Sequence, residues 1–95
     1  MLVFKSELDL ELINDNEDYD LIFKCHIKRL IQNNQKILSS GEELVIIVGR
    51  LDKEPEGYSL IWEDEKEIGN KKYEESFYRK GNKGILIYNI CKEGL

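Results

Sequence analysis

Residues 43–51 read ELVIIVGRL, and this stretch decides the fold because it is apolar on two sides. Side chains alternate between the faces of an extended chain. One face therefore carries Leu44, Ile46 and Val48, and the other carries Val45, Ile47 and Leu51. A strand with two apolar faces must be covered on both, which predicts an interior position in the sheet. Gly49 indicates a bulge or a close approach of another backbone.

Four further stretches have the pattern of strands. They are residues 2–13, 58–63, 72–79 and 85–91. The first three alternate, and the last is apolar on both faces apart from Asn89, so it too is expected inside the sheet. Polar connections separate them, because Asn, Asp, Gly and Pro favour turns. These connections are NDNEDYD at 14–20, DKEPEG at 52–57, the acidic run WEDEKE at 62–67 before a Gly-Asn pair, and the hairpin turn GNKG at 81–84.

Residues 21–31, LIFKCHIKRLI, are compatible with two structures. A strand would bury Leu21 and Phe23 and expose His26, and the aromatic and β-branched residues favour it up to Ile27. A short helix near residues 28–39 follows from the spacing of the later apolar residues, with Ser39-Ser40-Gly41 as its stop. The alternative is one long helix over 20–39 in a cystatin-like β-α-β4 layout.

The predicted fold is therefore mainly β, with α+β as the alternative. About six antiparallel strands in successive hairpins would form a bent sheet, a small barrel or a sandwich with one short helix. We find no internal repeat and no domain boundary, so residues 1–95 are expected to form a single domain.

Composition limits the classes of function. The 19 acidic and 14 basic residues give a net charge of −5, which argues against direct nucleic-acid binding. No segment reaches the length of a membrane span and no signal peptide is recognisable, so a cytoplasmic location is expected, in a bacterial cell or an infected host cell. The abundance of Ile, Lys, Asn and Glu suggests a bacterial or phage genome. Cys25 and Cys91 are expected to be buried free thiols.

No catalytic motif is present. The single histidine, His26, has no partner at a catalytic or metal-binding spacing, and its predicted place is the solvent face of a hairpin. The many carboxylates give no specific pair. We therefore predict no catalytic residues, no metal site, no cofactor and no enzymatic activity.

An acidic and aromatic surface is the candidate site. Acidic residues cluster in and beside the connections around residues 58–63, and aromatic residues lie on the neighbouring strands. The candidate partner-binding residues are Glu54, Glu56, Tyr58, Trp62, Glu63, Asp64, Glu65, Glu67 and Tyr78. Tyr78 is the most plausible outward-facing aromatic anchor.

These features predict a small acidic binding protein that occludes a basic surface of a partner, which could itself process nucleic acid. Immunity proteins and phage-encoded inhibitors of host defence act in this way, and the analogy rests on size, acidity and the lack of catalytic residues. The alternatives are a module that binds or sequesters a small ligand, and an oligomeric structural or assembly protein that uses an exposed sheet edge.

Overall fold

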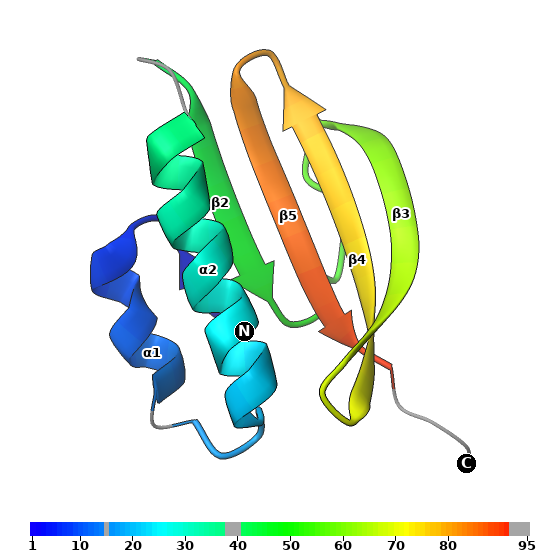
Figure 1. Ribbon diagram of the computed structural model, residues 1–95. Coiled ribbons are helices and arrows are strands. Elements are labelled where there is room, and N and C mark those ends of the chain that lie inside the picture. Colours follow the sequence, from blue (N-terminus) through cyan, green and yellow to red (C-terminus); the bar gives the residue numbers. More distant parts are fainter. Residues whose placement is uncertain (15, 38–40, 92–95) are drawn as a thin grey trace.

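A computed structural model describes residues 1–14, 16–37 and 41–91 (Figure 1). In chain order the elements are β1 (Leu2–Phe4), the 3-10 helix η1 (Glu7–Leu10), α1 (Glu11–Asn14), α2 (Leu21–Ile37), β2 (Glu43–Val48), β3 (Ser59–Ile68), β4 (Lys71–Lys80) and β5 (Lys83–Ile90). The strands form one sheet in the order β1-β2-β5-β4-β3.

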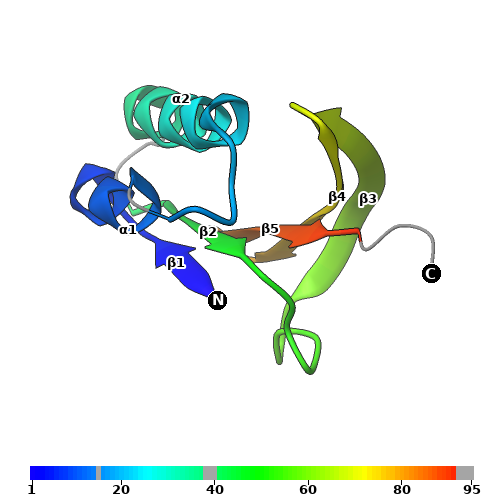
Figure 2. The same cartoon turned by 90° about the horizontal axis from the view of Figure 1, so that it is seen from below.

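The mainly β prediction is confirmed, and the sheet is bent but not closed into a barrel (Figure 2). The hairpins β3–β4 and β4–β5 are antiparallel, as expected. An entirely antiparallel sheet was the wrong prediction, because β2 and β5 run parallel. The chain leaves β2, crosses to the far edge of the sheet and enters β3, so that β5 returns beside β2 in the same direction (Figure 2).

The predicted strand at 21–27 is wrong, because these residues open the single helix α2. The Asp20 carboxylate accepts a hydrogen bond from the Phe23 backbone N–H at 2.9 Å, which caps the helix. Phe23, Ile27 and Ile31 then recur at helical spacing and are buried against the sheet, whereas Leu21 is 74% exposed. The long-helix alternative is the better description. Residues 38–40 lie outside the described residues.

The predicted strand at 2–13 is also too long. Its extended part is only β1, which pairs with β2. The Asp9 carboxylate then accepts hydrogen bonds from the backbone N–H groups of Lys5, at 2.7 Å, and Ser6, at 3.1 Å. This local bonding turns the chain into η1 and α1, as Ser and Asp commonly do at helix starts.

The interior position of β2 is confirmed. It lies between β1 and β5, and its two faces contribute to two apolar clusters. The larger cluster lies under the helices and includes Ile46 and Val48. The smaller lies on the opposite face and centres on Ile47, Tyr78 and Ile87. Gly49 has a φ of 139°, and a Cβ there would lie 3.1 Å from the Met1 Cα, so the close approach is confirmed.

The far end of the β3–β4 hairpin bends toward α2 (Figure 2). Lys71 Nζ donates to the Asp18 carbonyl at 2.7 Å, and the Asn70 N–H lies 3.5 Å from the Asp20 carboxylate. Gly69 permits this contact, because a Cβ there would lie 2.3 Å from an Asp20 carboxylate oxygen. The curled end of the hairpin and α2 therefore face one another on the same side of the sheet (Figure 2).

Candidate functional site

The acidic run predicted as a connection is part of β3, the ten-residue strand at the edge of the sheet. All of its residues except Ile68 are exposed. Its first half is apolar, with Leu60, Ile61 and Trp62 between 42% and 53% exposed. Residues 63–67 then carry four carboxylates, those of Glu63, Asp64, Glu65 and Glu67, which we call the acidic segment. The outer edge of β3 has no partner strand in the described part of the chain.

The structure divides the predicted site between the two faces of the hairpin. Trp62 pairs with Phe77 and Asp64 with Glu75, so these side chains lie on the side of the sheet that faces α2. Glu63, Glu65 and Glu67 alternate onto the other side. The predicted residues that lie on β3 are thus neighbours on one strand, but they do not form a single surface.

Tyr78 was wrongly predicted to be an outward anchor. Its side chain is 9% exposed and packs with Ile47 and Ile87, and Tyr58 packs against the same cluster. Burial raises the pKa of Tyr78, and the nearby Glu54 and Glu63 carboxylates raise it further. Glu54, from the loop before β3, and Glu63, on the strand, therefore both act on the Tyr78 hydroxyl.

Glu56 is exposed in the same loop. No hydrogen bond or ion pair among the described residues links it to the other predicted site residues. Its role in the site remains a prediction.

Two pairs of acidic residues lie directly opposite one another in the hairpin. Asp64 faces Glu75, and Glu65 faces Glu74. Like charges in such positions lower the stability of a sheet. The negative charge of Glu75 is compensated, because Lys66 Nζ lies 3.0 Å from one of its carboxylate oxygens. No ion pair compensates Glu65 and Glu74 within the described residues.

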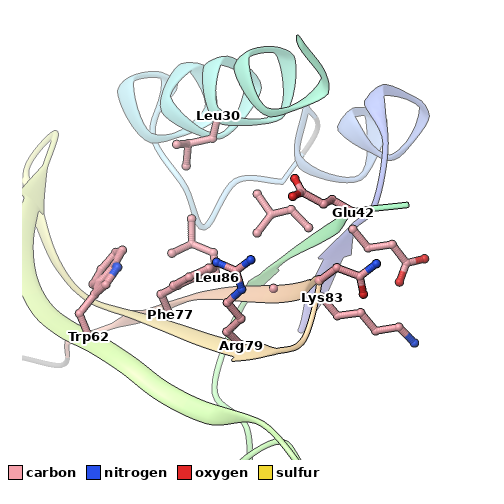
Figure 3. Close-up of a pocket in the computed structure, with 11 residues that line it drawn as sticks. Leu30, Glu42, Trp62, Phe77, Arg79, Lys83 and Leu86 are labelled. Atoms are coloured by element: carbon pink, nitrogen blue, oxygen red, sulfur yellow. The ribbon is translucent and has the colours of Figure 1, made fainter. Parts of the chain in front are cut away.

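A cleft lies between α2 and the curled part of the sheet (Figure 3). It encloses about 290 Å³. Its apolar lining comes from four strands and the helix, and consists of Leu30, Leu44, Trp62, Phe77, Gly84 and Leu86. Its polar lining consists of Glu42, Glu43, Arg79, Asn82 and Lys83. Of these eleven residues, only Trp62 was predicted as a site residue.

Sequence reasoning missed this cleft because its walls come from elements far apart in the chain. A partial signal existed. Glu75, Phe77 and Arg79 are spaced two residues apart and therefore share one face of β4. A guanidinium beside an aromatic ring could thus be anticipated. The opposing wall was not predictable. The spacing places Leu30 in a short helix near residues 28–39, but it does not show which part of the sheet that helix covers.

A chain of hydrogen bonds links Glu75, Tyr88 and His26 on the same side of the sheet, and we call it the polar chain. Glu75 is only 3% exposed and accepts a hydrogen bond from the Tyr88 hydroxyl. His26 Nε2 lies 3.0 Å from that hydroxyl oxygen. Since the single hydroxyl proton of Tyr88 is donated to Glu75, His26 Nε2 must be the donor to Tyr88. The predicted solvent position of His26 is therefore wrong, because helix α2 turns its ring inward.

The polar chain gives His26 a testable pH dependence. Burial lowers the pKa of His26 below 6.5; Glu75 opposes this effect, while Lys66 and Arg29 reinforce it. Because the unfolded chain takes up the proton more readily, the free energy of unfolding should fall as the pH drops below about 6.5. Urea unfolding measured from about pH 7.5 to about pH 5.5 should show a smaller fall in His26→Gln than in the native protein. An equal fall in the free energy of unfolding of both proteins would mean that a titratable group other than His26 causes it.

The remaining groups give little indication of chemistry. Cys25 and Cys91 form no disulfide among the described residues, but Cys25 is exposed and Cys91 half-exposed, so their predicted burial is wrong. No cluster of three or more His, Cys, Asp or Glu side chains that could hold a metal ion occurs in residues 1–14, 16–37 and 41–91. No helix in this part of the chain is both long and apolar enough to cross a bilayer.

Comparison with known protein families, characterised proteins and solved structures finds no match to this chain. Its function must therefore be argued from the exposed strand β3, the cleft and the polar chain.

Proposed function

We propose that the protein binds a basic partner protein through β3 and thereby covers the partner's functional surface. The observation that carries this proposal is the state of β3: a long edge strand, exposed on both faces, with four carboxylates within residues 63–67. An edge strand offers unpaired N–H and C=O groups to another extended segment. The carboxylates of β3 would attract a positively charged segment and repel a negatively charged one.

The sequence of β3 argues against a second copy as the partner. Pairing two copies through residues 63–67 would place acidic side chains opposite acidic side chains, which is unfavourable. Lysine or arginine side chains on the added segment would instead be attracted. Leu60 and Ile61 supply apolar contact area next to the acidic segment. Assembly through this edge is therefore a weaker proposal than binding of a different, basic chain.

The opposed acids support the same proposal. Glu65 and Glu74 are expected to lower the stability of the isolated hairpin, and no ion pair among the described residues offsets their repulsion. Local rules of this kind are commonly broken at functional sites. A basic partner would remove the repulsion on binding. If the partner processes nucleic acid, the carboxylates would take the place of phosphates, as in inhibitors of the immunity or anti-defence type.

Charge reversal tests this proposal. In affinity capture from host cells, we expect the native protein to retain a basic protein at low salt and to release it at high salt. The variant Glu63→Lys/Glu65→Lys should bind that protein about tenfold more weakly or worse. It should also unfold at a higher urea concentration, because the acid–acid repulsion is removed.

The matched control is Glu11→Lys/Glu17→Lys, which makes the same change in net charge at two exposed positions outside the hairpin. It should retain the partner. Equal binding by both double variants would mean that net charge, or another surface, is responsible. Hydrogen exchange of the complex should show new protection of the β3 amides; protection confined to other elements would contradict strand addition.

A further inference from the structure

The cleft has a well-defined apolar floor. Phe77 stands beside Gly84, where a Cβ would approach the ring to 2.9 Å, so glycine is needed for this packing. Trp62 stacks on Phe77 with ring centroids 5.9 Å apart. Leu86 completes the floor, and Leu30 projects from α2 above it (Figure 3). Trp62 is 42% exposed, so one aromatic face of the cleft is accessible from solvent.

Arg79 is the cation of the cleft. Its guanidinium lies beside Leu86 and Phe77, whereas the Lys83 side chain leads away from this floor (Figure 3). Arg79 Nε donates to the Gly81 carbonyl oxygen at 2.8 Å, which holds the side chain in place. A guanidinium has five N–H donors. The other four have no hydrogen-bond or ion-pair partner in residues 1–14, 16–37 and 41–91.

We propose that the cleft binds a small monocarboxylic acid with an aromatic or branched apolar body. The carboxylate would accept two hydrogen bonds from Arg79, since the guanidinium matches a carboxylate in shape and charge. The apolar body would lie on Phe77 and Leu86, against Trp62. Glu42 and Glu43 also line the cleft, so a ligand with a second negative charge would be repelled. This site is independent of the partner proposed for β3.

The volume supports a small occupant. The cleft volume of about 290 Å³ lies just below the usual range for small-molecule sites. An apolar lining with few polar groups is the usual composition of such sites, and here Arg79 fixes the orientation of the ligand. A single ring with a short acid side chain is a suitable size for a first probe.

The fluorescence of Trp62 can report ligand binding, because Trp62 is the only tryptophan in the chain and it lines the cleft. Titration with 3-phenylpropionate should change its fluorescence to a saturating value. The neutral analogue 3-phenylpropanamide should bind about tenfold more weakly or worse, since it lacks the charge. Arg79→Gln should weaken the binding of 3-phenylpropionate by a similar factor and should not weaken that of the amide.

The matched control is Lys80→Gln, which removes one positive charge from the next residue, on the opposite face of β4. It should bind 3-phenylpropionate as the native protein does. Arg79 is exposed, so its variant should fold normally, and circular dichroism checks this. The proposal is overturned if the acid does not bind at its solubility limit, if acid and amide bind equally, or if Lys80→Gln loses as much affinity as Arg79→Gln. Failure of partner capture through β3 would leave these results unchanged.

Discussion

Replacing Phe23 by alanine is expected to lower the free energy of unfolding by about 3–5 kcal/mol. Phe23 is fully buried, and it lies where helix α2 meets the sheet. Its ring stacks on Tyr73 with centroids 4.3 Å apart and meets Tyr88 edge-on at 5.8 Å. Truncation removes a large apolar surface from the core and leaves a cavity between two rigid rings. Urea unfolding followed by circular dichroism measures the change.

The neighbouring residue Leu21 makes the experiment decisive about the structure of residues 21–27. In the helix, Leu21 is 74% exposed, so Leu21→Ala should change stability by less than about 0.5 kcal/mol. In a strand, Leu21 and Phe23 would share the buried face, and both substitutions would be costly. A large loss in both variants would therefore contradict the single helix.

The strands β2, β4 and β5 were predictable because their own residues determine them. Residues 44–48 are apolar on both faces. The Gly81–Asn82 turn joins an alternating segment to one that is apolar on both faces apart from Asn89. The parallel pairing of β2 with β5 was not predictable. It depends on the path of residues 49–58 across the sheet, which no local pattern specifies.

The helix α2 was missed because the two possible structures share most of their buried residues. Phe23 and Ile27 are inward in either, so apolar spacing alone could not decide. The aromatic and β-branched residues favour a strand up to Ile27, but residues 2–13, its expected hairpin partner, are extended only as far as Phe4. Asp20 was the more informative residue, since an aspartate before a helical apolar stripe is a helix cap.

The candidate site was predicted in composition but not in arrangement. Asp64, Glu65 and Glu67 were identified by their charge, yet they were assigned to a connection because acidic residues are rare in strands. The strand forms because β4 supplies a continuous partner for it. Arg79 was missed because a single arginine in a charged chain carries no signal until Phe77, Leu86 and Leu30 surround it.

Two buried tyrosines on the α2 side of the sheet should respond in opposite directions to the loss of a hydroxyl. Tyr88→Phe is expected to destabilise the protein by about 2–3 kcal/mol, because its hydroxyl donates to the buried Glu75 carboxylate and accepts from His26. Burial and the bond to Glu75 raise the pKa of Tyr88, so this hydroxyl remains a donor throughout the stable pH range. Without it, Glu75 retains Lys66 alone.

Tyr73→Phe removes the same atom with the opposite expected outcome. The Tyr73 hydroxyl is buried and makes no hydrogen bond within the described residues, and desolvation raises its pKa to about 12. Its removal should leave the free energy of unfolding unchanged or increase it by about 1 kcal/mol, because an unsatisfied polar group costs energy in a core. Both variants keep the aromatic ring, so the difference between them isolates the hydrogen bonds. Equal losses in the two urea transitions would show that Glu75 does not depend on Tyr88, and the polar chain would then contribute nothing specific to the fold.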